Sequence, residues 1–556
     1  MATRSSEKTP ILPTSTQQPG GTPRASLATR LRQPRTLLAV AGIAFLATTV
    51  LILSLRTSAP SSSSPSGVSP IVSTLFPAKE DGTRDMVNLC EEKFITQELD
   101  HFRANGGGDT FEQRYFICSQ DTFDPKTGAI FFYVGNEADV LLYLNNTGLM
   151  WENAKPFNAL IVFAEHRYFG KSIPFGDKVL DHMEYLASTQ ALADYAVLVE
   201  DIKNKMDIDV PVIGFGGSYG GMLGTWFRTK YPHIVDGVIA GSAPVLAFLG
   251  DKEHPVDSEG FQRVVTFDMS EEAGSAPNCV PNVRKSIKTF LELGKTEAGR
   301  KEIATLFNLC DPEELTNEED VEVLVDAALG AYGSLAMGNY PYPSPYITSG
   351  ASFLPAYPMR TACEHLKADF ADDDYAGLLA AFRDSVGVFY NSTGQEKCYF
   401  PTASPANDTD IDIKGNFWDY LKCSELYTPM GSDGIHDVFP AQPANATIDD
   451  DACFKTWGVH LRPRYANMEY GGMKALRAAS NIVFSNGNYD PWSATGVLET
   501  LSDSVVFVPI EGGAHHLDLF FTHPMDPPAV TQAREIEKQH IKKWIDEFYA
   551  NKEKKN

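Results

Sequence analysis

Short apolar runs occur in two separate parts of the chain, between residues 130 and 240 and again between 481 and 510. Each run is about five or six residues long and mostly apolar throughout, without a regular alternation of apolar and polar side chains. Continuous apolarity of this kind is typical of strands that are covered on both faces of a parallel sheet. The runs that predict strands are 130–134, 160–164, 210–215, 235–240, 481–485 and 505–510.

The stretch between the two groups of predicted strands has a different pattern. Residues 246–465 are acidic and helix-prone, and they contain six of the eight cysteines. Because strands resume after this stretch, it predicts an insertion into one α/β sheet and not a separate module. We therefore expect a core formed by residues 90–245 and 466–550, with a large, mainly helical, disulfide-bearing lid at 246–465 inserted between strands.

A long helix is predicted to close the core. Between residues 528 and 549, apolar side chains recur with the spacing of one helix face. The stripe consists of Val530, Ala533, Ile536, Ile541, Trp544, Ile545 and Phe548.

The N-terminal region predicts a membrane anchor. Residues 36–55 carry no charge, and the first 56 residues hold seven Lys or Arg but only one acid. A bilayer span needs about twenty apolar residues, and basic flanks remain cytosolic. We expect a cytosolic basic tail at 1–35, a transmembrane signal anchor at 36–55 and a Ser/Pro-rich stalk and lead-in at 56–89. This is a single-pass type II arrangement, and a cleaved signal, which would give a secreted protein, is the alternative.

Cysteines and glycosylation sequons also indicate the secretory route. The eight cysteines are even in number and show neither CxxC nor a Cys/His zinc spacing. The sequence therefore predicts disulfides and does not predict a metal site. The catalytic domain should therefore lie in the lumen of a lysosome or vacuole, or at the cell surface. The predicted glycosylation sites are Asn145, Asn391, Asn407 and Asn445.

Composition narrows the class of protein further. The 556 residues are 43% hydrophobic and 21% charged, which is typical of a globular chain, and no collagen, heptad or solenoid repeat is present. The formal net charge of −25 argues against nucleic acid as a partner, because nucleic acid binding needs clustered cations. The acidic balance suits an acidic compartment, where protonation relieves repulsion between carboxylates.

A glycine-rich motif directly follows the strand predicted at 210–215. Gly216-Gly217-Ser218-Tyr219-Gly220 has the Gly-x-Ser-x-Gly pattern of a nucleophile elbow, in which the serine occupies a tight turn between a strand and a helix. The alternative is an ordinary glycine-rich turn. The flanking strand and helix favour the elbow and an α/β-hydrolase fold, with Ser218 as the candidate nucleophile.

The two partners that such a serine needs follow late strands in the expected order. In this fold the acid and the histidine come after the serine, each just beyond a strand. Asp490 follows the strand at 481–485, and His515 and His516 follow the strand at 505–510. An Asp-Pro turn and a surface histidine loop are the alternatives. The residues alone do not decide which histidine reaches Ser218.

Five separated stretches resemble the prolylcarboxypeptidase family of serine peptidases, which also includes dipeptidyl peptidase II and thymus-specific serine protease. They are Phe-Phe-Tyr-Val-Gly-Asn-Glu at 131–137, Glu-His-Arg-Tyr-Phe-Gly-Lys-Ser at 165–172, the elbow at 216–223, 485–492, and Gly-Ala-His-His-Leu-Asp-Leu at 513–519. The similarity covers about residues 90–550. It implies Ser218 as nucleophile, Asp490 as orienting acid and His515, the first of the pair, as base.

The resemblance also implies a substrate class. The expected reaction is hydrolysis at a prolyl bond (Pro-X), releasing either a C-terminal residue or an N-terminal dipeptide, without a cofactor. The partners are then peptides with proline near a terminus. An esterase on the same fold and a non-enzymatic adhesion module are alternatives. The sequence leaves open whether the protein is a monomer or a homodimer.

Further residues follow from the fold and the resemblance. The oxyanion should be held by the backbone N–H of Tyr219 and by an amide from the loop of Gly135, Asn136 and Glu137. Met222 and Trp492 match family positions that line the prolyl pocket, and ordinary core packing is their alternative role. The family motif commonly continues to an arginine where this chain has Phe520.

The resemblance implies three of the disulfides. These are Cys279–Cys363, Cys310–Cys398 and Cys423–Cys453. Cys90 and Cys118 then remain as the fourth pair.

Overall fold

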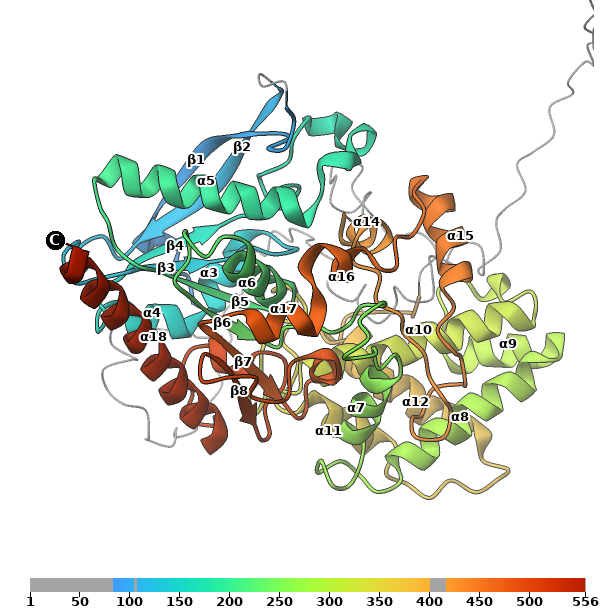
Figure 1. Cartoon of the computed structure of the whole chain (residues 1–556). Helices are drawn as coiled ribbons and strands as arrows, with labels where there is room; N and C mark the ends of the chain where they lie inside the picture. The colour runs from blue at the N-terminus through green and yellow to red at the C-terminus, as the bar shows by residue number, and fades with distance from the viewer. Residues whose placement is uncertain (1–83, 105–107, 401–416, 556) are drawn as a thin grey trace, which may run out of the picture.

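The computed structural model describes residues 84–104, 108–400 and 417–555 (Figure 1). The predicted tail, the predicted anchor at 36–55, most of the predicted stalk and Asn407 lie outside these ranges. Within the described ranges, none of the helices combines the length and the apolarity needed to cross a bilayer.

The described strands form one mixed sheet in the order β1-β2-β4-β3-β5-β6-β7-β8. β1 and β2 pair antiparallel with each other, β2 pairs antiparallel with β4, and all other neighbours are parallel. Each predicted apolar run corresponds to one of the strands from β3 to β8. The bounds are β1 Cys90–Glu98, β2 Thr110–Cys118, β3 Ile130–Tyr133, β4 Leu160–Ala164, β5 Val212–Gly217, β6 Gly237–Gly241, β7 Ile482–Gly487 and β8 Val505–Ile510.

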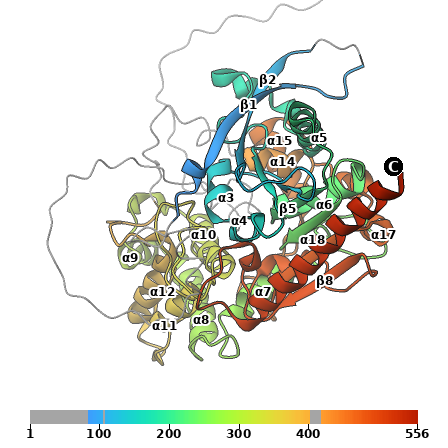
Figure 2. The same ribbon diagram turned by 90° about the vertical axis from the view of Figure 1, so that its left-hand side faces the viewer.

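Both faces of the sheet are covered, as the continuous apolar runs predict (Figures 1 and 2). Successive residues of a strand point to opposite faces. Phe132 of β3 therefore packs in the apolar cluster with α5 and α6, whereas its neighbour Phe131 packs in the cluster with α3, α4 and α18. The covering helices are α3 Val140–Asn146, α4 Gly148–Ala154, α5 Ser188–Met206, α6 Tyr219–Lys230 and α18 Pro528–Lys555.

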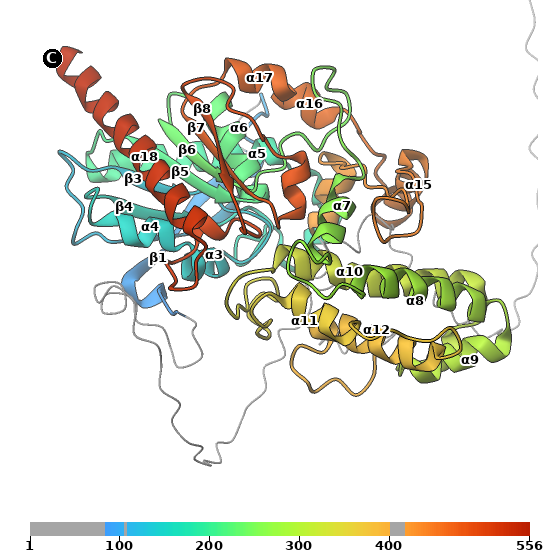
Figure 3. The same ribbon diagram turned by 90° about the horizontal axis from the view of Figure 1, so that it is seen from below.

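A helical segment lies between β6 and β7 in the chain order, and the strands resume after it. Figure 3 shows α8, α9, α10 and α12 grouped to one side of the sheet. The helices of this segment are α7 Gly260–Asp268, α8 Cys279–Gly294, α9 Glu297–Leu306, α10 Glu318–Met337, α11 Pro358–His365, α12 Tyr375–Tyr390, α14 Phe417–Ser424, α15 Ala446–Trp457, α16 Tyr465–Tyr470 and α17 Gly472–Ala478.

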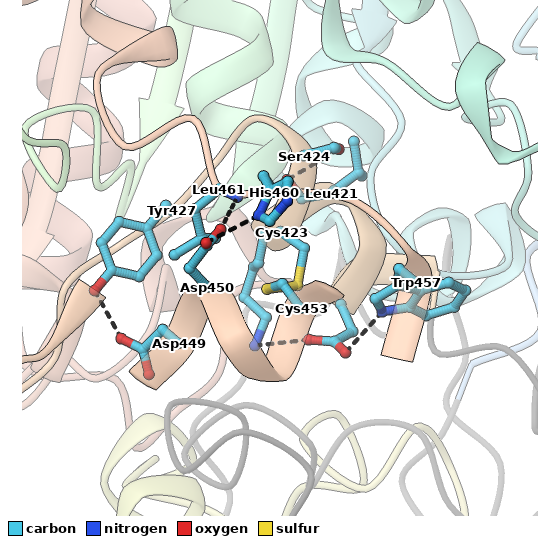
Figure 4. The surroundings of a disulfide bond; sticks show 12 residues. Leu421, Cys423, Ser424, Tyr427, Asp449, Asp450, Cys453, Trp457, His460 and Leu461 are labelled. Carbon is cyan, nitrogen blue, oxygen red and sulfur yellow. Dashed lines mark hydrogen bonds and ion pairs between the residues drawn. A yellow bond between two sulfur atoms is a disulfide. The ribbon is translucent and has the colours of Figure 1, made fainter. Parts of the chain in front are cut away.

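Four disulfides are present, and they join the same pairs that the sequence leads us to expect. Cys90–Cys118 links the edge strand β1 to its neighbour β2, and the other three disulfides lie in the inserted segment. Figure 4 shows Cys423–Cys453, which joins α14 to α15. Beside it, the Tyr427 hydroxyl donates to Asp449 at 2.7 Å and Trp457 Nε1 donates to Asp419 Oδ2 at 3.0 Å. The crosslink and these bonds fix the two helices against each other.

Three of the four predicted glycosylation sites are described. Asn445 is exposed and caps the N-terminus of α15 with its side-chain oxygen. Asn145 and Asn391 are partly buried, and Asn145 Oδ1 accepts a hydrogen bond from Met86 N at 2.9 Å. Glycosylation at these positions stays a prediction.

Helix α18 holds the loop that follows β8. Arg534 is 5% exposed, and its guanidinium donates to the backbone oxygens of Asp518 and Leu517 at 2.8 and 3.1 Å. The same group pairs with Asp526 at 2.6 Å. Because these contacts begin one residue after His516, the closing helix helps to fix the position of both histidines.

Candidate active site

Ser218 stands between the end of β5 and the start of α6, as the elbow motif predicts. Its backbone has φ 56° and ψ −126°, a conformation that residues with a side chain rarely adopt. Such a backbone costs on the order of 1–3 kcal/mol and persists only where the surroundings impose it. Here the Ser218 N–H donates to Gly241 O at 3.0 Å, and Met222 N donates to Ser218 O at 3.0 Å. β6 and α6 together hold the strained turn.

Two glycines of the motif are required by close approaches. A Cβ at Gly216 would lie 2.2 Å from the carbonyl oxygen of Gly220, within the turn itself. A Cβ at Gly217 would lie 2.7 Å from the ring of His516. The pattern around Ser218 therefore reflects the tightness of the turn and the proximity of the histidine loop.

His515 and Asp490 meet at the carboxyl ends of β8 and β7. His515 Nδ1 lies 3.0 Å from Asp490 Oδ1, and the two side chains are 6% and 0% exposed. Asp490 Oδ1 also accepts from Trp492 N at 3.1 Å, which fixes the carboxylate. With Nδ1 donating its proton to Asp490, the tautomer leaves Nε2 as an acceptor.

The inserted segment and β6 hold the backbone of the histidine loop. His515 N donates to Met337 O at 3.2 Å, and the Tyr340 hydroxyl donates to His515 O at 3.1 Å. His516 N donates to Ser242 Oγ at 2.8 Å, just after β6. The histidine pair is therefore fixed jointly by the sheet and by the end of α10.

His516 occupies a different environment from His515. Its ring makes edge contacts with Tyr346 and Phe520, at centroid distances of 5.2 and 5.4 Å. Its Nδ1 is buried without a hydrogen-bond partner among the described residues. Burial, and secondarily the neighbouring His515, lower the pKa of His516 well below the ordinary value. Phe520, which stands where the family motif commonly has arginine, thus packs its ring against the neutral His516.

One pocket brings most of the predicted site residues together. Ser218, His515, His516 and the two predicted pocket residues Met222 and Trp492 all line it. Asn136, Glu137 and Tyr219 line it as well, whereas Asp490 lies behind His515. The remaining lining residues are mostly apolar and were not predicted from the sequence: Leu142, Tyr143, Pro244, Ala247, Phe248, Met337, Tyr346, Ile347, Trp418, Leu426 and Thr428.

The loop after β3 lies beside the elbow. Asn136 Nδ2 donates to Gly217 O at 3.3 Å and the Tyr133 hydroxyl donates to Asn136 Oδ1 at 3.3 Å. Gly135 does not line the pocket, and its carbonyl accepts from the Tyr195 hydroxyl at 2.8 Å. Burial raises the pKa of the Glu137 carboxyl to about 7. The loop thus presents one weakly acidic side chain next to Ser218.

Residues 165–172 form buried ion pairs and a contact to α6 beside this loop. Glu165 pairs with Arg114, and Arg167 pairs with Asp194 through Nε at 2.7 Å, with both of these ion pairs fully buried. His166 Nε2 lies 3.1 Å from the Tyr219 hydroxyl, and burial lowers the pKa of His166 to about 4. These contacts brace the strand ends and the first residue of α6.

No cluster of three or more His, Cys, Asp or Glu suited to a metal ion occurs in the described part of the chain. The parallel strands, the elbow serine and the histidine–carboxylate pair at the strand ends define an α/β-hydrolase. The predicted fold class is therefore confirmed.

Comparison with known proteins assigns the family. A family model described as serine carboxypeptidase S28 matches residues 97–537. The lysosomal Pro-X carboxypeptidase of Bos taurus is 38% identical over 469 residues, which are 84% of this chain and 90% of that protein. The protein of the same name from Homo sapiens is 39% identical over 461 residues, 82% of this chain and 88% of that one. The thymus-specific serine protease of Mus musculus is 26% identical over 478 residues, with 82% and 88% covered.

The chain belongs to the serine carboxypeptidase S28 family, and it is a serine-type peptidase whose substrates are peptides. The family predicted from the five sequence stretches is confirmed.

Proposed function

We propose that this protein is a serine exopeptidase that hydrolyses Pro-X bonds with Ser218 as nucleophile, His515 as base and Asp490 as orienting acid. The observation that carries the proposal is that Ser218 and His515 line one pocket, while His515 is hydrogen-bonded to the buried Asp490. Chain order and the elbow conformation support the same three residues.

In the proposed reaction, Ser218 Oγ attacks the carbonyl carbon of the prolyl residue. His515 Nε2 takes the hydroxyl proton, and Asp490 stabilises the imidazolium that forms. When the C–N bond breaks, His515 gives that proton to the leaving amine, and a water molecule then cleaves the acyl-enzyme by the same route. The backbone N–H of Tyr219 and an amide of the loop after β3 hold the oxyanion, and loss of one such donor costs about 2.7–4 kcal/mol of barrier.

The pocket supports a prolyl residue beside the scissile bond. A proline ring is apolar and has no N–H, so it fits a site with few polar groups. Met222 is buried, and Trp492 is fixed by its Nε1 contact to Met337 Sδ at 3.2 Å and by an edge contact with Phe261. Met337 comes from α10 and Trp418 from α14, so the inserted segment acts as a lid that supplies part of the pocket.

Release of a C-terminal residue is the favoured activity. The two mammalian proteins described above at 38% and 39% identity are both named lysosomal Pro-X carboxypeptidase, and they support this reaction and a lysosomal location. Release of N-terminal X-Pro dipeptides is the second candidate, because the mouse relative and the family resemblance leave open which end of the peptide is released. An esterase activity on this fold is a third.

One decapeptide with a proline near each end separates these activities. We expect mass spectrometry of the products to show loss of the single C-terminal residue that follows proline. Loss of an N-terminal X-Pro dipeptide would instead assign the dipeptidyl peptidase. An unchanged peptide together with turnover of p-nitrophenyl esters would contradict the peptidase assignment and favour the esterase.

We further propose that residues 36–55 anchor the protein with its N-terminus in the cytosol and its peptidase domain in the lumen. The uncharged stretch with its basic flank supports this arrangement. The full chain should stay with membranes after a carbonate wash and leave them once it is cleaved within 56–89. Recovery of the intact chain in the soluble fraction would instead indicate a secreted form.

A further inference from the structure

A carboxypeptidase must recognise the free carboxylate of its substrate, yet the pocket offers no cation for it. Among the described residues that line the pocket, none is Lys or Arg. The one acidic side chain on this lining, within the described ranges, is Glu137. The partner of a substrate carboxylate therefore has to be sought among neutral donors and this acid.

The position of Glu137 suits contact with substrate. It follows β3 on the loop whose Asn136 donates to Gly217 O at 3.3 Å, so the loop is tied to the residue before Ser218. The side chain is partly buried, and Oε2 is shielded from solvent without a hydrogen-bond partner among the described residues. A buried polar atom without a partner costs about 1–3 kcal/mol, which a ligand that pairs with it recovers.

The surroundings of Glu137 favour its neutral form. Burial is the main cause that raises its pKa to about 7, opposed by its own backbone N–H, by His515 and by Asn136. The titratable groups that interact electrostatically with Glu137 are His515 and four tyrosines. Burial raises the pKa of each tyrosine far above 10; they are Tyr133, Tyr143, Tyr219 and Tyr346. Because these tyrosines stay neutral, burial remains the main influence on the protonation of Glu137.

We propose that protonated Glu137 holds the free C-terminal carboxylate of a Pro-X peptide through a shared proton. This inference rests on the proposed Pro-X carboxypeptidase function. A carboxyl O–H that donates to a carboxylate forms a short, charge-assisted hydrogen bond, and it replaces the cation that the pocket lacks. An ammonium group needs ionised Glu137, which the site disfavours, so the burial of Glu137 favours the carboxylate end of the peptide over the amino end.

The consequence is a preference for free-acid substrates that weakens as pH rises. A group that titrates near pH 7 is almost fully protonated at pH 5 and about one-tenth protonated at pH 8. The test compares an N-blocked Pro-Phe dipeptide that has a free carboxylate with the same peptide as its C-terminal amide. The ratio of their kcat/KM values cancels every pH effect on the catalytic steps that the two substrates share. We expect the ratio to fall about tenfold between pH 5 and pH 8.

Glu137→Gln provides the matched variant. Glutamine keeps the shape and an N–H donor at every pH, so the ratio should become flat between pH 5 and pH 8. Glu364→Gln is the control, because Glu364 is exposed, pairs with the nearby Lys367 at 2.9 Å and does not line the pocket. This control should keep the tenfold fall of the wild type.

The inference is overturned by a wild-type ratio that does not change with pH, a result that needs no variant. It is equally overturned if the ratio of kcat/KM values in Glu137→Gln still falls with pH as it does in the wild type. Loss of only the cleavage of unblocked X-Pro anilides in this variant would also overturn it, because Glu137 would then bind the substrate's amino group. Wild-type enzyme that cleaves neither Pro-Phe substrate would refute the proposed carboxypeptidase function itself.

Discussion

Replacing Ser218 with alanine lowers kcat for a Pro-X peptide by about a million-fold, the loss typical when the serine of such a triad is removed. Alanine keeps the Cβ of serine, so it accepts the same strained backbone between β5 and α6. The Ser218 hydroxyl forms no hydrogen bond with another described residue that its loss would break. The variant should therefore unfold at the temperature of the wild type, while its turnover of an N-blocked Pro-Phe dipeptide becomes undetectable.

Ser480→Ala is the control for this measurement. Ser480 is exposed, and its hydroxyl accepts from Arg228 at 2.9 Å on the surface near β7. Its removal should leave kcat unchanged. Normal turnover by Ser218→Ala with an intact fold would end the assignment of the nucleophile.

His515→Gln and His516→Gln should differ in activity by several orders of magnitude. His515 is hydrogen-bonded to Asp490, and its loss should lower kcat about as much as the loss of the serine. His516 is enclosed by Tyr346 and Phe520 and stays neutral, so its replacement should reduce kcat by no more than about tenfold through altered packing. Steady-state kinetics on the two purified variants measures the difference.

Asp490→Asn accompanies this pair as an internal check. It should lower kcat by about ten-thousand-fold, because asparagine favours the wrong tautomer of the histidine. If His516→Gln were as inactive as His515→Gln while remaining folded, the choice of base would be wrong.

The parallel strands could be predicted because their environment is uniform. β3 and β4 are buried at every position, so burial on both faces leaves a continuous apolar run in the sequence. The hairpin of β1 and β2 left no such signal. β1 lies at the edge of the sheet and carries exposed charged residues among a few buried ones, so neither a continuous run nor a clean alternation marks it.

The candidate site also contains some residues that the sequence marks and others that only the tertiary packing brings to it. The positions of Ser218, Asp490 and His515 just beyond strands could be predicted, because the fold requires candidate residues of these types there in this order. Met337, Tyr340 and Tyr346 could not, because they reach the site through the packing of the inserted segment, and nothing local in the sequence marks them. The orientation of the two histidines is also tertiary. It depends on the left-handed backbone of His516, at φ 38°, and on its bond to Ser242.

The inserted segment has more than a covering role in this arrangement. The last residue of α10 and the loop just after it hold the backbone of His515, through Met337 O and the Tyr340 hydroxyl. The same helix supplies Met337 to the pocket wall. Packing of the inserted segment and alignment of His515 are therefore linked. A variant whose inserted segment packs less tightly should lose activity under conditions in which the sheet is still folded.

The most direct measurement of the central claim is covalent labelling with a fluorophosphonate. The reagent reacts when an activated serine oxygen forms a bond to phosphorus and fluoride leaves, and unactivated serines do not react. After digestion, mass spectrometry should locate the label on Ser218 alone in the wild type, and no label should appear in His515→Gln. A label on another residue, or equal labelling of Ser218 in His515→Gln, would contradict the proposed triad.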